Sequence, residues 1–436
     1  MQKFAKGFFV GAATAAHQVE GNNIHNDCWA QEQMQHSSYT EPSLDAVDHY
    51  HRYEEDIRLM AGAGLNAYRF SIEWARIEPE EGKFDDTEIE HYRRVIDCCR
   101  ENGLEPVVTL LHFSSPVWLI RKGGWEADTT PADFARYVRY VMERLGGGLR
   151  YVCTINEANM GVQVAAIAER YKKQMMAQLA KAQAGGGSVD GGVQMGLNME
   201  KMMANQKAIA EETLQVFGVE KAECFTSPRT PHGDALVMEA HKAAREVIRA
   251  VCPGVKVGLT LSLHDIQALP GGEARAQKEW EDEFTHYLPA IAGDDFFGVQ
   301  NYTRGRYDAD GVVAAPDGAE LTQMDYEFYP EGLEHVIRRV AEDFKGELMV
   351  TENGIATADD TRRTAFIESA LDGVQRCVAD GLPVRGYFYW SLMDNFEWQK
   401  GYAMQFGLVA VDRANGQVRT PKPSLAFLGE YAPEKV

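Results

Sequence analysis

Eight short apolar or β-rich segments recur along the chain, and amphipathic stretches with helical spacing fall between them. The eight segments span residues 7–14, 67–72, 106–111, 151–156, 256–263, 296–302, 347–353 and 384–390. Several are apolar on both faces, as expected for strands of a parallel sheet that is covered on both sides. The stretches 46–64 and 131–146 show the intervening helical pattern. Strand and helix alternating eight times predict an α/β fold, a single closed (β/α)8 TIM barrel.

An open, doubly wound sheet is the alternative that the same alternation allows. It is less favoured because no glycine-rich phosphate loop follows the first strand segment. Barrels often run past about 250 residues as one unit, so we expect one catalytic domain over residues 1–436 with extended βα loops. A Met/Gly-rich segment at about 160–206 contains the run AGGGSVDGG (184–192). It could link two domains, but strand segments continue on both sides, so we interpret it as a loop insertion.

Acidic residues outnumber basic ones by 65 to 44, and the formal net charge is −21. Nucleic acids and anionic membranes both require a basic face, so we expect neither as a partner. The same balance disfavours anionic substrates. No apolar stretch is long enough to predict a membrane span.

The seven cysteines are scattered without a CxxC pair. This pattern indicates reduced thiols and a cytoplasmic enzyme. The apolar run 7–16 follows two lysines and ends in small residues, so it imitates a secretory signal. We expect it to remain in the protein, because its removal would delete the first barrel strand.

Polar, ionisable or aromatic residues stand at the carboxyl ends of most predicted strands, where the catalytic groups of such barrels lie. They are Gln18, Arg69, His112, Asn156, Glu157, Tyr302, Glu352 and Trp390. Glu157 and Glu352 occupy similar settings, TINE and VTEN, on the fourth and seventh strands. We expect these strands to lie opposite one another, with the two carboxyl groups facing across the barrel mouth. Cleavage of a glycosidic bond needs such a pair, one acid and one carboxylate.

Longer motifs extend this pattern over nearly the whole chain. They are GAATAAHQVEG (11–21), YRFSIEWARIEPEEG (68–82), LHFSSPVWL (111–119), TINEA (154–158), GVQNYTR (298–304), VTENGIA (350–356), YFYWSLMDNFEWQKGYAMQFGLVAVD (387–412) and RTPKPS (419–424). In these motifs the chain resembles glycoside hydrolase family 1, the β-glucosidase family. TENG and WSLMDNFEW are the most specific of them.

The resemblance implies a role for each matching residue. Glu352 would be the nucleophile that forms a glycosyl-enzyme ester, and Glu157 the acid/base. Asn156 would bind the sugar 2-hydroxyl. Tyr302 and Arg69 would hold Glu352 ionised, because a hydrogen bond or a positive charge lowers the pKa of a carboxyl group.

The same resemblance implies a sugar-binding set of Gln18, His112, Trp390, Glu397 and Trp398. A neutral hexose presents hydroxyls on its edge and C–H groups on its face, so bidentate polar groups and an indole wall suit it. Outside this pattern, His112 would more often be a core histidine, and a lone glutamate at a strand end would more often be a solvated residue.

Three departures from the family pattern stand out. Ala158 and Asn159 follow the acid/base, where the family usually has proline. Gln300 stands where asparagine is usual, and Gln405 where arginine is common. The segment 160–206 does not resemble the usual family loop.

We therefore expect a retaining β-glycosidase acting on neutral β-linked monosaccharides, foremost β-glucosides and also β-galactosides or β-fucosides, with no cofactor and no metal. The alternatives are a 6-phospho-β-glycosidase, a transglycosylating enzyme and a catalytically silent sugar-binding relative.

The 160–206 segment predicts an adaptable apolar aglycone site, because methionines crowd it and its glycines could let it move. A longer helix pair whose methionines pack against the barrel is an equal alternative. The seven methionines concerned are Met160, Met175, Met176, Met195, Met199, Met202 and Met203.

Overall fold

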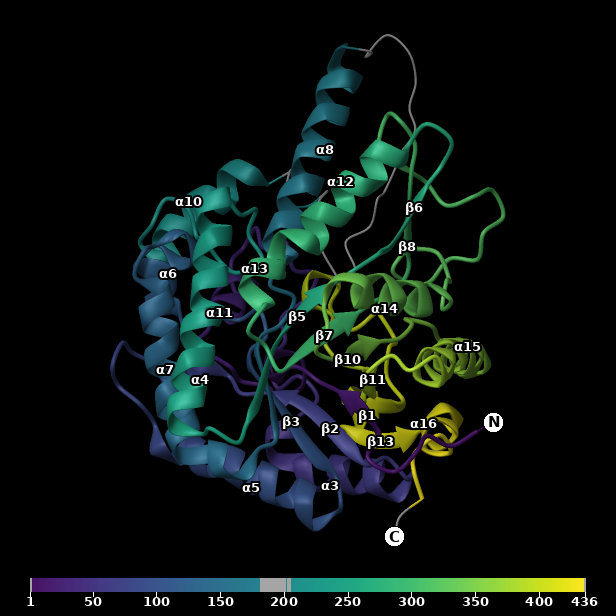
Figure 1. Ribbon diagram of the computed structural model, residues 1–436. Coiled ribbons are helices and arrows are strands. Elements are labelled where there is room, and N and C mark those ends of the chain that lie inside the picture. Colours follow the sequence, from purple (N-terminus) through teal and green to yellow (C-terminus); the bar gives the residue numbers. More distant parts are fainter. Residues whose placement is uncertain (1, 181–200, 202–204, 435–436) are drawn as a thin grey trace.

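In a computed structural model, the eight predicted strands close into one parallel barrel (Figure 1). The structure describes residues 2–180, 201 and 205–434. The barrel strands are β1 (Phe9–Ala13), β2 (Ala67–Ser71), β3 (Glu105–Leu111), β4 (Tyr151–Ile155), β5 (Lys256–Ser262), β7 (Phe296–Gln300), β10 (Glu347–Asn353) and β11 (Val384–Trp390). Their order around the barrel is β1-β11-β10-β7-β5-β4-β3-β2. The predicted TIM barrel is confirmed, and each predicted strand boundary lies within two residues of the observed one.

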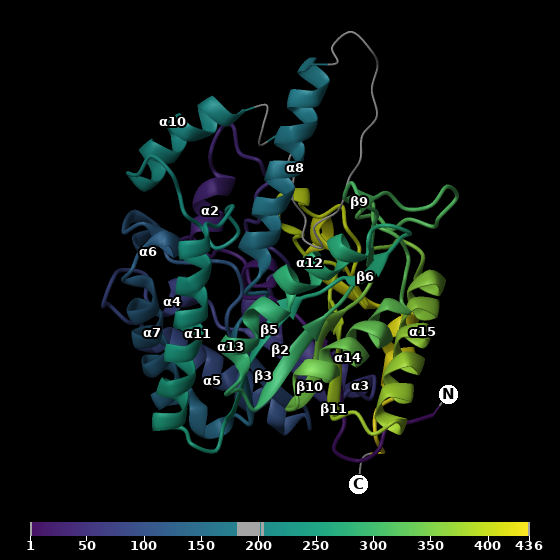
Figure 2. The ribbon, with the colours of Figure 1, turned by 45° about the horizontal axis from the view of Figure 1, so that its top comes forward.

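A helix follows each barrel strand and covers the outside of the sheet (Figures 1 and 2). These helices are α3 (His49–Gly62), α5 (Asp86–Glu101), α7 (Thr130–Leu145), α11 (Pro231–Val251), α13 (Leu288–Ile291), α14 (Gly332–Asp343), α15 (Asp360–Ala379) and α16 (Pro423–Gly429). The helical stretches predicted at 46–64 and 131–146 are α3 and α7. Aspartate side chains fix two of the starts: Asp85 accepts from the Thr87 N–H at 2.8 Å and Asp359 from the Thr361 N–H at 2.9 Å.

Extra elements in the connecting loops add to this frame. They are α1 (Ala16–Val19), α2 (Asp27–Glu32), α4 (Trp74–Ile77), α6 (Val117–Arg121), η1 (Gly124–Glu126), η2 (Gly146–Gly148), α8 (Met160–Ala180), α10 (Gln206–Phe217), β6 (Asp265–Ala268), α12 (Glu273–Glu283), η3 (Thr285–Tyr287), β8 (Arg304–Tyr307), β9 (Val312–Val313), η4 (Trp398–Lys400), β12 (Val409–Asp412), η5 (Arg413–Asn415) and β13 (Val418–Pro421). Figures 1 and 2 show α8 projecting from the barrel beside α12 and the β6–β8–β9 sheet. The predicted loop insertion therefore begins as a helix of 21 residues.

Apolar side chains fill the amino-terminal half of the barrel interior. Phe9, Tyr151 and Phe296 meet edge to face there, with ring centroids 5.6 and 5.5 Å apart. A larger apolar layer lies between the sheet and the surrounding helices. Because the amino-terminal end is filled in this way, the polar side chains of the interior gather at the carboxyl ends of the strands. Within the described ranges, no helix combines the length and apolar character needed to cross a membrane.

Candidate active site

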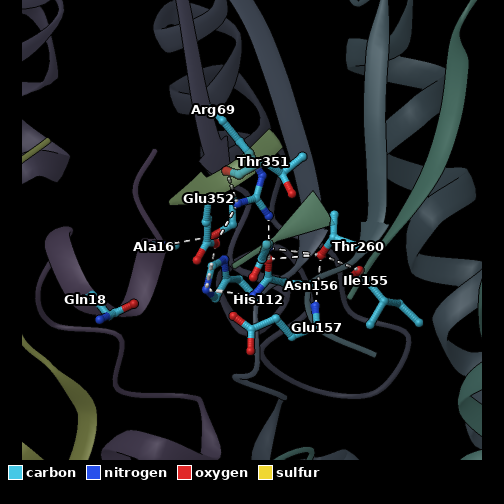
Figure 3. Close-up of polar contacts among 12 residues, drawn as sticks. Ala16, Gln18, Arg69, His112, Ile155, Asn156, Glu157, Thr260, Thr351 and Glu352 are labelled. Carbon is cyan, nitrogen blue, oxygen red and sulfur yellow. Dashed lines mark hydrogen bonds and ion pairs between the residues drawn. The ribbon is translucent and has the colours of Figure 1, made fainter. Parts of the chain in front are cut away.

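The predicted site residues come together at the carboxyl ends of the barrel strands, and all of them are buried. Six of them are labelled in Figure 3: Gln18, Arg69, His112, Asn156, Glu157 and Glu352. Arg69 lies in β2, Glu352 in β10 and Trp390 at the end of β11. Asn156 and Glu157 directly follow β4. The expectation that the two glutamates stand on opposite strands is wrong, because only β5 and β7 separate β4 from β10 around the barrel. Eight strands place opposite members four steps apart, whereas these strands are three steps apart.

Both carboxylate oxygens of Glu352 have a partner. Its Oε1 lies 2.6 Å from Nη1 of Arg69, and its Oε2 accepts a hydrogen bond of 2.6 Å from the Tyr302 hydroxyl. Arg69 is itself fully buried and also donates through Nη2 to Oδ1 of Asn156. One guanidinium therefore fixes both Glu352 and Asn156, and Figure 3 shows it between them.

Glu157 is held by its backbone more than by its carboxyl group. Its N–H donates to Oγ1 of Thr260 at 2.9 Å, and its φ of 44° lies in the left-handed region. Non-glycine residues rarely adopt that region unless their surroundings enforce it. The carboxyl atom Oε2 is buried without a hydrogen-bond partner. Glu157 therefore presents one unsatisfied oxygen from a constrained backbone.

The two glutamates differ in their tendency to ionise. Burial is the main cause that raises the pKa of Glu157 well above its ordinary value, and the charge of Glu352 raises it further. Burial also raises the pKa of Glu352, but Arg69 and the Tyr302 hydroxyl act in the opposite direction. Because neighbouring carboxyl groups resist double ionisation, the pair suits one carboxylate, Glu352, and one carboxylic acid, Glu157.

A second cluster lies around the predicted sugar-binding residues. Nε2 of Gln18 donates to the Phe396 carbonyl at 2.7 Å and to Oε2 of Glu397 at 3.2 Å. The His112 ring is stacked on Trp390 and Trp398, with centroids 5.6 and 6.3 Å apart. Indole faces and polar atoms therefore stand together, as a sugar ring requires.

Several buried polar atoms among the described residues of this region lack hydrogen-bond partners, including Oε1 of Gln18, Nδ1 of His112 and Oε2 of Glu157. Burial, followed by the charge of Arg69, lowers the pKa of His112 well below its ordinary value, so its ring is neutral at pH 7. Unpaired buried polar atoms are costly, and they cluster where a ligand supplies the missing partner. Sugar hydroxyls can both donate to and accept from these atoms.

Two supporting residues were not predicted as part of the site. Thr260 on β5 contacts the Glu157 N–H, and Gln300 at the end of β7 donates to Asn156. Gly298 makes room for Thr260, because a Cβ at that position would lie 2.5 Å from the threonine methyl group. The sequence signal for both was a polar residue in an otherwise apolar strand.

Comparison with known proteins agrees with this geometry. The sequence model of glycosyl hydrolase family 1 matches residues 1–182 and 284–435. The chain is 30% identical to the 1,4-β-D-glucan glucohydrolase of Thermotoga neapolitana, with 97% of each chain covered. It is also 30% identical to the β-glucosidase of an Agrobacterium species, over 97% of this chain and 94% of the relative.

Solved structures extend the likeness to the whole fold. The crystal structure of β-glycosidase BGL167 is 44% identical and superposes with a TM-score of 0.86 over 99% of both chains. The apo structure of β-glucosidase 1317 is 39% identical, with a TM-score of 0.85 over 97% of this chain and 98% of that one. The chain therefore belongs to glycosyl hydrolase family 1 and is a glycoside hydrolase.

Proposed function

We propose that the protein hydrolyses β-glucosides with retention of anomeric configuration, using Glu352 as nucleophile and Glu157 as acid/base. Glu157 gives its proton to the glycosidic oxygen while an oxygen of Glu352 attacks the anomeric carbon. The aglycone leaves as an alcohol, and an ester joins the sugar to Glu352. Glu157, now a carboxylate, takes a proton from water, which attacks the same carbon and releases the sugar. Only protein side chains and water take part in these steps.

The unequal environment of the two glutamates is the observation that carries this proposal. A nucleophile has to stay ionised, which the Arg69 and Tyr302 contacts of Glu352 favour. An acid has to keep its proton and reach the leaving oxygen, which the raised pKa of Glu157 and its unpartnered Oε2 favour. If the two roles were exchanged, the acid would be Glu352, whose oxygens already have partners, and the nucleophile would be Glu157, which keeps its proton.

The sugar-binding set supports a neutral hexose. Gln18 and Glu397 offer bidentate polar groups, and Trp390 and Trp398 offer indole faces. A carboxylate at Glu397 would repel a sugar 6-phosphate, which disfavours a 6-phospho-β-glycosidase. A silent sugar-binding relative would not need both glutamates.

A groove lies beside the segment that leaves Glu157 and is the proposed aglycone site. Val162 and Ile167 of α8 form one side, and Val312 and Val313 of β9 line another. Ion pairs such as Arg304–Glu327 border the apolar strip. The groove therefore suits an apolar aglycone with a polar edge.

The methionine hypothesis for this aglycone site finds no support in Met160. That residue is fully buried in the hydrophobic core. The side chains of the six other methionines, and the glycines at 185–187 and 191–192, lie outside the described residues. In the proposed aglycone site, the apolar contacts therefore come from residues of α8 and β9 instead of from the methionines.

We also propose a cytoplasmic location, which the free state of all seven cysteines supports.

The proposed function is tested with a panel of 4-nitrophenyl glycosides of both anomers, and proton NMR identifies the first-formed anomer. We expect release of β-glucose from the β-glucoside. Turnover confined to 6-phosphoglucosides, first-formed α-glucose, or no turnover would each contradict the proposal. Added methanol distinguishes hydrolysis from transglycosylation through the yield of methyl glucoside.

A further inference from the structure

Gln300 takes no part in the proposed chemical steps but contacts a residue of the site. It ends β7, its side chain is fully buried, and its Nε2 donates to Oδ1 of Asn156 at 2.7 Å. The same Nε2 lies 3.2 Å from Oγ1 of Thr260. Because β5 stands between β7 and β4, the Gln300 side chain reaches across a whole strand. Asparagine, which is one methylene shorter, would have less reach toward Asn156.

The contacts around Asn156 fix which way its amide points. Its Oδ1 is approached by three donors, from Arg69, Gln300 and, at 3.3 Å, Thr260. A flipped amide would place its N–H groups against the donors of Arg69 and Gln300. The Nδ2 group of Asn156 therefore points away from these donors and toward His112, whose Nε2 lies 3.2 Å from it.

Stability of the barrel does not explain an amide at position 300. The Oε1 atom of Gln300 is buried without a hydrogen-bond partner, and such an atom is costly. An apolar side chain of similar length would fill the same space without that cost. The amide is therefore better explained by the hydrogen bond that its Nε2 gives to Asn156.

We infer that Gln300 is a positioning residue that makes Asn156 a hydrogen-bond donor toward the 2-hydroxyl of the sugar. This inference rests on the proposed glycosidase function. If Asn156 can only donate, the 2-hydroxyl accepts from it and has its own proton free for the carboxylate of Glu352. Arg69 contacts both Asn156 and Glu352. The group that would donate to this hydroxyl and the group that would accept from it are therefore fixed relative to each other.

The test compares Gln300→Met with the unmodified enzyme on 4-nitrophenyl β-glucoside and on its 2-deoxy analogue. Methionine matches the length of glutamine but cannot donate. We expect kcat/KM on the 2-hydroxy substrate to fall about tenfold or more, the size of one lost transition-state hydrogen bond. The fall should lie mainly in kcat, because this contact strengthens as the transition state forms. On the 2-deoxy substrate the change should stay within about twofold, since the contact is already absent there.

Gln300→Glu sharpens the test. Its carboxylate would accept where glutamine donates and would oppose Oδ1 of Asn156. The selective loss on the 2-hydroxy substrate should therefore exceed that of Gln300→Met. If neither variant folds, as judged by the thermal midpoint, Gln300→Asn replaces them; its shorter amide should weaken the contact with Asn156 and give a smaller loss that is still confined to the 2-hydroxy substrate.

Equal losses on the two substrates, or no loss on either, would overturn the inference about Gln300 while leaving the proposed function standing. Failure of the unmodified enzyme to turn over any β-glycoside would instead refute the proposed function. The two failures are therefore distinguishable in one experiment.

Discussion

Glu352 and Glu157 are the same side chain at nearly the same depth, with exposed fractions of 2% and 5%, yet their surroundings are opposite. Arg69 from β2 and Tyr302 after β7 occupy both oxygens of Glu352. Glu157 keeps one oxygen unpartnered and is fixed through its backbone, by Thr260 and a left-handed φ.

The difference shows that partners, more than depth, decide what a buried carboxyl group can do. Burial alone pushes both groups toward the neutral form. Donors from β2 and from the segment after β7 counter this effect at Glu352, whereas Oε2 of Glu157 has no hydrogen-bond partner among the described residues. This difference is what the proposed roles require, a charge kept at Glu352 and a proton held and then released by Glu157.

Removal of the nucleophile should have the largest effect. Glu352→Gly should lower kcat for β-glucosides by about 10⁵-fold or more, since the covalent route disappears. Added azide should restore turnover and give the α-glucosyl azide, because azide then attacks from the face that Glu352 occupied. Product NMR identifies the anomer.

Glu157→Ala should give the opposite anomer. The glycosyl-enzyme on Glu352 still forms from an activated aryl glucoside, and azide then attacks from the other face to give the β-glucosyl azide. Glu347→Gln, at the amino-terminal end of β10, serves as control and should behave like the unmodified enzyme. Interchanged anomers in the two variants would require exchanging the assigned roles.

The acid side is tested by pH. The activity should fall at low pH as Glu352 gains a proton and at high pH as Glu157 loses its proton. Since burial and the charge of Glu352 raise the pKa of Glu157, the alkaline limb should lie well above the pKa of a free glutamate. Glu157→Gln should lose that limb and about 10²- to 10⁴-fold in rate on unactivated glucosides. Persistence of the alkaline limb in this variant would assign it to another group.

Tyr302→Phe, which removes one of the contacts of Glu352, should lower activity less than the substitutions of the two glutamates. The Tyr302 hydroxyl lowers the pKa of Glu352, so its loss should raise that pKa and move the acidic limb of kcat/KM to higher pH. A loss of about tenfold in kcat/KM near neutral pH corresponds to one charge-assisted hydrogen bond. Tyr389→Phe, in the neighbouring strand β11, is the matched control. If both variants keep the same acidic limb, the hydroxyl of Tyr302 does not help to hold Glu352 ionised.

The sequence predicted the barrel well because strands covered on both sides leave continuous apolar runs, as in β10 and β11. The proposed sugar-binding residues could also be picked out in the sequence, since their motifs are local, and the structure brings them together at the carboxyl ends of the strands. Contacts between distant strands were not readable in this way. Gln300 and Asn156 lie 144 residues apart, and no local pattern reveals which polar strand residues meet inside a barrel.

The insertion shows a second limit. The Met-, Ala- and Gly-rich composition of this segment allowed a mobile loop and a helix pair packed on the barrel equally, and over residues 160–180 the helix α8 forms. The opposite placement of the two glutamates was an error of a different kind, because the fourth and seventh of eight strands that follow one another around a barrel are three steps apart, and opposite strands are four steps apart.

Substitutions in the proposed aglycone groove should have the smallest effects on kcat/KM, and these effects should differ most between substrates. Val162→Ser and Val313→Ser each remove apolar surface from the groove without touching the glutamates. We expect kcat/KM for a bulky hydrophobic glucoside to fall about threefold to tenfold per variant, as for the loss of one or two methyl contacts. Methyl β-glucoside, which barely enters the groove, should change by less than about twofold.

Val418→Ser is the matched control for these variants, because Val418 is an exposed strand valine of β13, outside the groove. The unmodified enzyme should also prefer the bulky hydrophobic glucoside to cellobiose, since the apolar strip offers a second sugar few hydrogen-bond partners. A clear preference for cellobiose would show that the polar edge of the groove, with pairs such as Arg304–Glu327, selects the leaving group. The difference between the two sides of the site would then be one of hydrogen bonding throughout, with no apolar contribution.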